Sequence, residues 1–353
     1  MRWLFRLMLL LVIGVSQAIG ADSTDVVLSK IVEAYQLRPL EERKADLGAK
    51  ERLGQALFFD SIVSGPRSIA CATCHIRSKG AGDGLPMAVG LGAHGLASDR
   101  LDAKQALVIP RNALPFFNRD SPDFIAMFWD GRVQIGSGAF ETPLGTRLPA
   151  GFDNLLAAAA VFPLAEPDEM LGRSKASGNK QIYHAELVGP DVDGDHTQNR
   201  TLAVFQTLIL RLLEPGQSAP SMAARKYRAL FTDAYPSVAL EQIQIRHIGN
   251  ALSAYIGAAF ATKRAPWDHY IAGDQKAITE DQKRGAIVFY GKGRCAVCHS
   301  GTHFTDFKFH GLAIPQLRVG KHTRNIDYGR AAATSRPEDR LSLIHISEPT
   351  RPY

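Results

Sequence analysis

The sequence predicts a mainly α-helical fold with two domains. Apolar residues recur at helical spacing in several segments, whereas no sustained alternation of apolar and polar residues indicates a sheet. The chain has 353 residues, of which 45% are hydrophobic and 22% are charged, and this is enough chain for two domains with separate cores. The same composition excludes a disordered, collagen-like or polytopic membrane protein.

Three segments carry the clearest helix signals. Apolar residues at helical spacing mark Leu47 to Phe58, and Gln242 to Phe260 reads as a long helix rich in small residues, which permit close packing. Thr279, followed three residues later by Gln282, resembles a capping box. It would open a third helix that ends before Cys295.

Loops rich in Gly and Pro separate these helices, from Gly80 to Gly95 and from Gly136 to Gly151. The polar stretch from Gly172 to Arg200 is the predicted domain boundary. It divides the chain into an N-terminal domain, residues 21–185, and a C-terminal domain, residues 186–340.

The first twenty residues resemble a secretory signal peptide. Arg2 and Arg6 flank a short apolar run from Leu7 to Val15, which ends in small residues. A transmembrane helix needs roughly 18 or more consecutive apolar residues, so an uncleaved N-terminal anchor is the less favoured alternative. We therefore expect a periplasmic protein without a membrane span in its mature form.

The net charge gives no reason to expect a nucleic-acid partner. The whole chain carries a formal charge of +6, and removal of the two signal-peptide arginines leaves +4. This modest charge favours solubility, and a negatively charged partner would require a local basic patch.

The four cysteines occur in two identical motifs, Cys71-Ala72-Thr73-Cys74-His75 and Cys295-Ala296-Val297-Cys298-His299. In a CxxCH motif the two thiols lie one helical turn apart and form thioether bonds to the vinyl groups of haem, and the His becomes the proximal iron ligand. A zinc site would not need a His after each pair, and a thioredoxin-like CxxC is expected only once. A disulfide would leave the histidines unexplained. The motifs therefore predict two covalently bound haem c cofactors.

The motifs and their surroundings resemble the bacterial di-haem cytochrome c peroxidase family, which includes MauG-like proteins. The resemblance runs from about Leu53 to Arg330 and implies two cytochrome c-like domains, each around one haem. Its elements are Leu53-Gly54-Gln55-Ala56-Leu57-Phe58-Phe59-Asp60, Pro110-Arg111-Asn112, Phe128-Trp129-Asp130-Gly131-Arg132, Asp168-Glu169-Met170, Gly273-Asp274, Arg284-Gly285, Cys298-His299-Ser300-Gly301 and Phe304-Thr305-Asp306.

The resemblance implies a division of labour between the two haems. The N-terminal haem would be peroxidatic and the C-terminal haem would receive electrons, because peroxide reduction needs two electrons at one iron and a donor cytochrome gives one at a time. The attachment residues would be Cys71, Cys74 and His75 for the first haem and Cys295, Cys298 and His299 for the second.

Three further residues receive roles from the resemblance. Glu169 would be the acid that moves the peroxide proton, although a surface Glu after Pro167 at a helix start is an equal alternative. Trp129 would serve electron transfer between the haems, the alternative being a core Trp. Asn112 would help to hold Ca²⁺, the alternative being a turn Asn.

The sequence departs from the family at the distal side of the first haem. Many members carry a switchable His in a Gly-His-Gly segment, where this chain has Gly90-Leu91-Gly92, with His94 nearby. Leu cannot ligate iron. The hypothesis is that the first haem is open in the resting oxidised enzyme.

The sixth ligand of the second haem is the other departure. Members use a downstream Met or, when MauG-like, a Tyr, but all six methionines precede Cys295. Tyr328 lies upstream of the usual position, and His303, His310 and His322 are alternatives. Residues 341–353 resemble a translated sequencing adapter, so we expect a non-native tail on an incomplete C-terminal domain.

Together these features predict a periplasmic di-haem peroxidase. It would reduce hydrogen peroxide with electrons from a small c-type cytochrome or a cupredoxin. Two alternatives remain open: a MauG-like oxidase that modifies a partner protein or small substrate, and a non-catalytic di-haem electron carrier. Whether the protein forms a homodimer is also open.

Overall fold

A computed structural model describes residues 23–42, 46–101, 108–109, 111–172, 187, 197–311 and 329–333. The predicted signal peptide, the domain boundary at residue 185 and the tail from residue 341 lie outside the described residues. The described part is mainly helical, which confirms the predicted fold class. No helix in it combines the length and the apolar character that crossing a bilayer requires.

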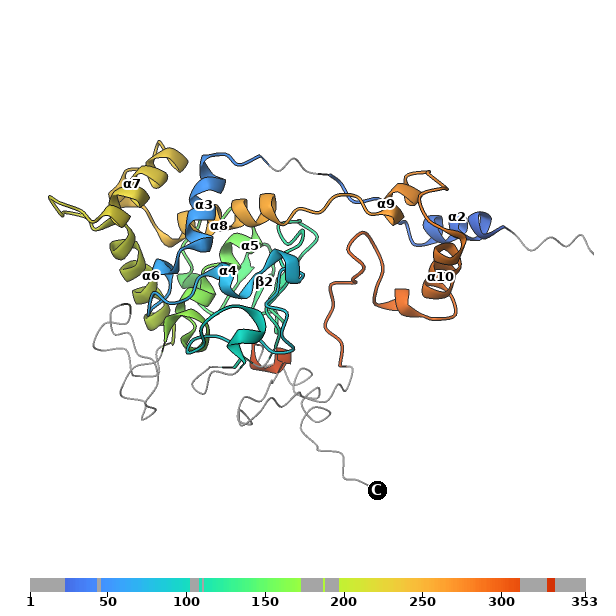
Figure 1. Cartoon of the computed structure of the whole chain (residues 1–353), viewed down its shortest axis with the longest axis horizontal. Coiled ribbons are helices and arrows are strands. Elements are labelled where there is room, and N and C mark those ends of the chain that lie inside the picture. Colours follow the sequence, from blue (N-terminus) through green and yellow to red (C-terminus); the bar gives the residue numbers. More distant parts are fainter. Residues whose placement is uncertain are drawn as a thin grey trace, which may run out of the picture. The chain divides into compact units, whose positions relative to one another are not determined.

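Figure 1 labels the helices and strand β2. The helices are α2 (Thr24–Ala34), α3 (Ala49–Phe59), α4 (Cys71–Cys74), α5 (Leu155–Ala159), α6 (Thr197–Leu213), α7 (Met222–Ala234), α8 (Ile245–Ala259), α9 (Pro266–Ile271) and α10 (Glu280–Tyr290). The strands are β1 (Ala126–Met127), β2 (Val133–Ile135) and β3 (Phe140–Glu141), in one antiparallel sheet of that order. Strands this short leave no alternating pattern in the sequence, so the analysis of periodicity missed them.

The chain divides into two compact units. Unit 1 comprises residues 1–42 and 263–308, and unit 2 comprises residues 43–262 and 309–353. This grouping differs from a division at residue 185, because α7 and α8 pack with α3 in unit 2, where α6 packs on α7, and α2 packs on α10 in unit 1. The assignment of one haem domain to each half of the sequence stays a prediction.

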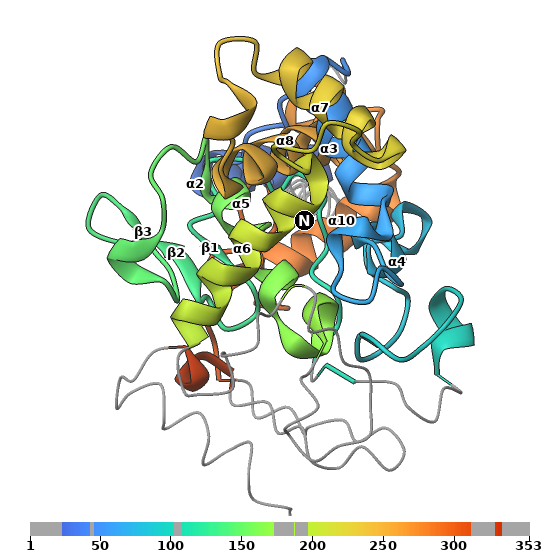
Figure 2. The same ribbon diagram turned by 90° about the vertical axis from the view of Figure 1, so that its left-hand side faces the viewer.

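Unit 2 is built around the contact between α3 and α8, two helices that the sequence predicted. Figure 2 shows both beside α5, α6 and α7; of the strands, β1 and β2 contact α5. The helices cross closely because Gly54 lies directly against the backbone carbonyl of Ala251, where any side chain would collide. Leu53, Leu57 and Ile248 are fully buried in this region. The close packing predicted for the small residues of α8 is confirmed here.

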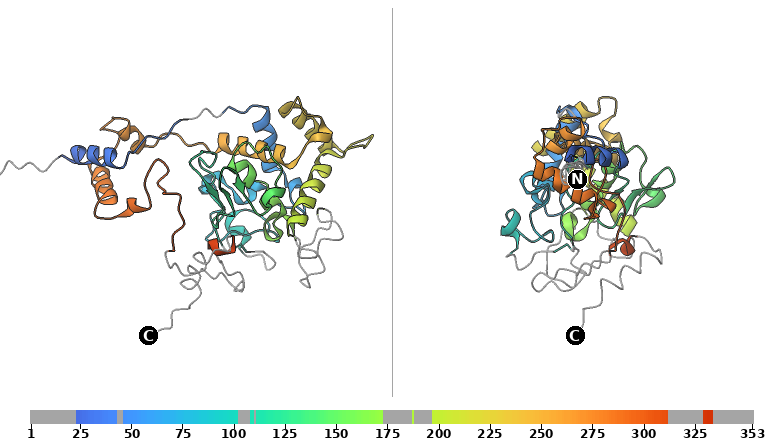
Figure 3. Two further views of the ribbon diagram at one scale, coloured as in Figure 1. Left: turned by 180° about the vertical axis from the view of Figure 1, so that it is seen from behind. Right: turned by 90° about the vertical axis from the view of Figure 1, so that its right-hand side faces the viewer.

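Unit 1 holds two small apolar clusters, to which α2, α9 and α10 all contribute. Figure 3 shows α2 in blue and α10 in orange. Trp267 stacks on Tyr270 and on Tyr290, with ring centroids 5.6 and 5.9 Å apart. The predicted capping box is confirmed: Thr279 accepts a hydrogen bond from the Gln282 N–H, and Gln282 accepts one from the Thr279 N–H. It begins α10, which ends before the second CxxCH motif.

Candidate functional site

Unit 2 contains a cavity of about 310 Å³ beside the first CxxCH motif. This volume is within the range of small-molecule and cofactor sites. Much of the wall is apolar and comes from α3, α5 and α8. The lining also includes predicted site residues from four separate stretches of sequence, namely Cys71, Cys74, His75, Asn112, Trp129 and Glu169. The fold therefore brings these residues to one place.

The first CxxCH motif forms α4 and the turn after it. Cys71 and Cys74 begin and end this helix, and the N–H of His75 donates to the carbonyl of Cys71 at 3.0 Å. The imidazole Nδ1 lies 3.1 Å from the carbonyl oxygen of Ala81, and the ring stacks on Phe116 with centroids 3.8 Å apart. A bonded Nδ1 orients the ring and leaves Nε2 as the nitrogen for iron.

The protonation of these groups fits a covalently attached haem. Burial raises the pKa of Cys71 to about 12 and that of Cys74 to about 11, so both thiols are protonated at pH 7. A redox-active CxxC depends instead on a thiolate. Burial lowers the pKa of His75 to about 4, although hydrogen bonds to backbone carbonyls oppose this shift. The imidazole is therefore neutral, which is the form that coordinates metal.

Glu169 lies in a π-helical turn, Pro167–Leu171. The N–H of Leu171 donates to the carbonyl of Glu166, five residues earlier, at 3.0 Å. Single π-helical turns are rare and occur frequently at functional sites. The sequence predicted only a helix start after Pro167, because nothing in residue type distinguishes an α from a π turn. The observed turn places the Glu169 carboxyl on the cavity wall.

The charge environment of Glu169 gives it an unusual pKa. Burial raises this pKa to about 7, while the Arg132 guanidinium, 3.6 Å from the carboxylate, opposes the rise. Neighbouring carboxylates add to the rise by repulsion, namely those of Glu166, Asp130 and Asp168. The side chain keeps 26% of its surface accessible, and it lines the cavity. A carboxyl that titrates near pH 7 can both accept and donate a proton.

Arg132 is a site residue to which sequence analysis gave no role. Its Nη1 donates to the Asp130 carboxylate at 3.2 Å, and its guanidinium lies 4.0 Å from the centre of the Phe128 ring. Burial lowers the pKa of Arg132, but the surrounding carboxylates outweigh this and raise it. The sequence feature that could have pointed to Arg132 is the Asp130-Gly131 pair before it, which is typical of a tight turn. The structure has this turn between β1 and β2, and Gly131 has φ +68° there.

Trp129 and Asn112 are direct neighbours in the structure. The indole N–H of Trp129 donates to the backbone carbonyl of Asn112 at 2.7 Å, and the Asn112 side-chain amide donates to the carbonyl of Leu85 at 2.5 Å. Trp129 is 41% exposed, so it is not the buried core Trp of the alternative reading. Its role in electron transfer and the role of Asn112 in Ca²⁺ binding stay predictions.

The second CxxCH motif lies in unit 1, where Cys295–Val297 form a 3₁₀ turn in place of the α-helical turn of the first, and its His has matching hydrogen bonds. The N–H of His299 donates to the carbonyl of Cys295 at 2.9 Å, and its Nδ1 lies 3.2 Å from the carbonyl oxygen of Phe304. Cys295 and His299 are exposed. None of the four cysteines forms a disulfide, as the haem assignment requires.

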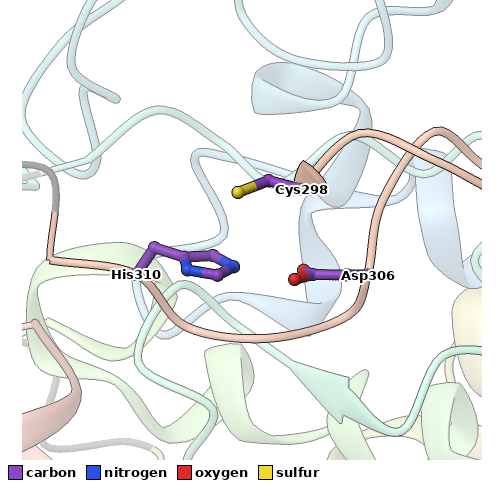
Figure 4. A group of neighbouring side chains, drawn as sticks. All are labelled: Cys298, Asp306 and His310. Atoms are coloured by element: carbon purple, nitrogen blue, oxygen red, sulfur yellow. The ribbon is translucent and has the colours of Figure 1, made fainter. Parts of the chain in front are cut away.

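Figure 4 shows Cys298 with Asp306 and His310. The Asp306 N–H donates to the carbonyl of Cys298 at 2.9 Å, which folds the segment back on the motif. We do not assign a separate metal site to this group, because a haem thioether would occupy the Cys298 sulfur and His310 belongs to unit 2.

Residues 48–276 match the family model described as di-haem cytochrome c peroxidase. The chain belongs to this family. It is 31% identical over 265 residues to the methylamine utilization protein MauG of Methylorubrum extorquens, covering 75% of this chain and 53% of that protein. It is 24% identical over 302 residues to the cytochrome c551 peroxidase of Pseudomonas aeruginosa, covering 86% and 63%. The chain thus spans little more than half the length of the curated relatives it matches most strongly.

Solved structures include similar chains. The crystal structure of a MauG-like protein associated with microbial copper homeostasis has a TM-score of 0.49 and 20% identity, covering 86% of this chain and 70% of that one. The diheme peroxidase BthA from Burkholderia thailandensis has a TM-score of 0.47 and 20% identity, covering 82% and 62%. Membership of a di-haem family implies two haem c cofactors, in agreement with the two CxxCH motifs.

The segment predicted to lie on the distal side of the first haem carries Leu91 where the sequence analysis expected a switchable His. Leu91 is fully buried, and its N–H donates to the carbonyl of Asp168 at 3.3 Å. His94 is exposed and is not among the cavity-lining residues. This arrangement agrees with an open first haem, which nevertheless stays a hypothesis. The sixth ligand of the second haem also stays open, because Tyr328 and His322 lie outside the described residues.

Proposed function

We propose that the protein is a periplasmic di-haem peroxidase that reduces hydrogen peroxide to water with electrons from a small c-type cytochrome or cupredoxin. The observation that supports this most strongly is the position of the Glu169 carboxyl on the wall of the cavity that Cys71, Cys74 and His75 also line. The overall reaction consumes one peroxide, two electrons and two protons and yields two waters.

When bound, the haem would supply a redox-active iron. The chain's own residues would do the rest. His75, which is neutral and is oriented by Ala81 and Phe116, would be the residue that holds the iron. The Glu169 carboxylate would take up a proton from peroxide and return it to the oxygen that leaves as water. Arg132 keeps part of the Glu169 population ionised at neutral pH.

The test is peroxide turnover by the haem-loaded full chain with reduced cytochrome c. Glu169→Gln should lower kcat/KM for peroxide by about 10²- to 10⁴-fold, the usual contribution of a positioned acid or base. Glu241→Gln, which removes an exposed carboxylate outside the cavity, is the matched control and should retain activity. Wild-type rates in Glu169→Gln would show that Glu169 is not the proton carrier.

A MauG-like oxidase is the second candidate, because one relative named MauG is 31% identical and Leu91 replaces the switchable His. In that case peroxide should react with the oxidised protein while reduced cytochrome c is consumed slowly. The electron-carrier alternative predicts no peroxide reaction and two six-coordinate haems in the full-length protein.

We also propose that Asn112 contributes to a Ca²⁺ site. Its amide nitrogen already donates to Leu85, which leaves the side-chain oxygen as the ligand atom, and Ca²⁺ prefers such oxygen ligands. Chelation with EGTA should lower turnover and change the haem spectrum, and Ca²⁺ should restore both. Asn112→Ala should lose this sensitivity. A wild-type protein unaffected by EGTA that contains no calcium by elemental analysis would contradict the proposal.

A further inference from the structure

The turn that carries Glu169 is hydrogen-bonded to two separate loops, one on each side. The carbonyl of Asp168 accepts from the N–H of Leu91 at 3.3 Å, and the carbonyl of Met170 accepts from the N–H of Gly65 at 2.8 Å. The peptide group directly before Glu169 and the one between Met170 and Leu171 are therefore held from outside the turn. The position of the carboxyl consequently depends on the position of both loops.

A buried arginine fixes the first loop. Arg100 is only 1% exposed, and its guanidinium donates five hydrogen bonds to backbone carbonyls of residues 89–95. The contacts include the Val89 carbonyl at 3.0 Å and the Gly90 carbonyl at 2.6 Å. Gly90 lines the cavity, and the next residue, Leu91, bonds to the Glu169 turn. A guanidinium suits this task because its planar fork carries five N–H donors.

A second buried arginine fixes the other loop in the same way. Arg211, on α6, is 9% exposed and donates to the carbonyls of Ile62 at 3.0 Å, Ser64 at 2.7 Å and Gly65 at 3.4 Å. Gly65 lies directly against the carbonyl of Leu171, so only glycine fits between this loop and the turn. Neither arginine is among the cavity-lining residues.

We propose that Arg100 and Arg211 are positioning residues for Glu169, which they hold at the cavity wall through the two loops. Burying a guanidinium is costly, and an apolar residue often stabilises a core at least as well. Two such residues hold the two loops that bond to the turn just before and just after Glu169, and placement of its carboxyl is the simpler explanation for both. The inference rests on the proposed role of Glu169.

The experiment is a double-mutant cycle on the haem-loaded full chain. Arg100→Met and Arg211→Met are each made in the wild-type and Glu169→Gln backgrounds, with Arg100→Lys and Arg211→Lys as milder changes that keep the charge. Two rates are measured: peroxide turnover, and association of cyanide, which binds from HCN and needs a proton acceptor. Arg228→Met is the control, because Arg228 bonds two backbone carbonyls of a loop that does not line the cavity.

Each Arg→Met change should lower both rates by about 10- to 100-fold in the wild-type background, the scale of a small misplacement of a catalytic group. In the Glu169→Gln background the same changes should have less than about twofold effect, because the positioned group is already gone. Equal losses of rate in both backgrounds would mean that the arginines stabilise the fold without positioning Glu169. That result would overturn the proposal. If Glu169→Gln alone loses no activity, the proposed function fails instead.

If the variants do not fold, a measurement on the wild-type protein still tests whether the two loops hold the Glu169 turn in place. Hydrogen exchange should show the amides of Gly65 and Leu91 strongly protected, on a level with α3 and α8. The Arg→Lys variants should make exchange faster at both loops and at residues 166–171. Rapid exchange of these two amides in the wild type would overturn the proposal, since loops that open freely cannot fix Glu169.

Discussion

The two CxxCH motifs have the same residue pattern and matching hydrogen bonds at the His but different surroundings. In unit 2, His75 stacks on Phe116 beside a cavity that also holds a carboxyl with a pKa of about 7. In unit 1, Val297 is 63% exposed and His299 is exposed in its turn. Haem attachment therefore explains what the motifs share, and only their surroundings can explain a difference in function.

The difference matches the two kinds of chemistry that the proposed reaction combines. Breaking an O–O bond needs proton delivery next to the iron, in a site that limits access of water. Receiving an electron from another protein needs close approach to the surface and no proton carrier. The exposed second motif fits the second task, and the first motif, with Glu169 and Arg132 on its cavity wall, fits the first.

The largest expected effect comes from removing each proximal His in turn. His75→Gly should abolish the reaction with peroxide and lower turnover by more than about 100-fold, because losing even a partner of a metal ligand costs 10- to 100-fold. His299→Gly should lower cytochrome c oxidation comparably but leave the first haem able to bind cyanide at the wild-type rate. Absorption and EPR spectra of the resting proteins would show which of the two haems has lost its proximal ligand in each variant. Equal loss of cyanide binding in both variants would contradict the division of labour.

A second prediction concerns the free energy of unfolding at the acidic site. The folded-state pKa of Glu169 is about 7, above its ordinary value of 4.5, so folding favours the protonated form. Stability should therefore fall as pH rises from about 4.5 to 7, because the unfolded chain releases this proton first. Glu169→Gln should stabilise the protein at pH 8 by up to about 3 kcal/mol and have little effect at pH 4.

Denaturant unfolding of the haem-loaded protein at the two pH values measures this difference. The exposed Glu241→Gln should show no such pH dependence. Glu169 should therefore lower the stability of the folded protein at neutral pH while it supports activity. On the acidic side of its pH profile, kcat/KM should fall with a midpoint near pH 7. A Glu169→Gln variant less stable than wild type at pH 8 would show that the carboxylate is stabilised in the folded protein.

Sequence reasoning was most successful where chemistry requires fixed spacing. The helix over α3, the small residues of α8 and the capping box at Thr279 follow from local rules, and the structure confirms them. The motif at Cys71 could be assigned because two thioethers and one ligand need that spacing. Family resemblance led to Glu169 and Trp129, and the cavity contains both.

The residues that position these groups could not be predicted in the same way. Arg100 and Arg211 act through backbone carbonyls, which every residue carries, so no sequence pattern marks their partners. The π-helical turn depends on which carbonyl each N–H selects. The grouping of α2 with α10 depends on contacts between residues far apart in sequence, including the ion pair of Asp25 with Lys283 at 2.8 Å.

That ion pair gives a smaller prediction, for unit 1 alone. Lys283 is 5% exposed and contacts both Asp25 and Glu280, and these bonds lower the pKa of Asp25 and raise that of Lys283. The pair should stabilise between about pH 3.8 and 10.5, the ordinary values of the two groups. Lys283→Met should speed hydrogen exchange in α2 and α10 at pH 7 and leave exchange around the first motif unchanged.

Lys276→Met is the matched control for this prediction, because Lys276 is an exposed lysine of the same unit. The effect on the unfolding midpoint should be roughly a few degrees at most, as for other ion pairs that are open to solvent on one side. Faster exchange at α3 or α8 in Lys283→Met would mean that the two units do not respond independently.

The smallest expected effect is that of His94→Ala, which tests whether the first haem is open at rest. His94 is exposed and outside the cavity lining, and Leu91, at the position of the switchable His, has no atom that could bind iron. The substitution should therefore leave the resting EPR spectrum unchanged and kcat/KM for peroxide within about twofold, as for an ordinary surface change. A low-spin signal of a bis-His first haem in the wild type, lost in His94→Ala, would contradict this. It would mean that the loop held by Arg100 rearranges when haem binds and closes the first site to peroxide at rest.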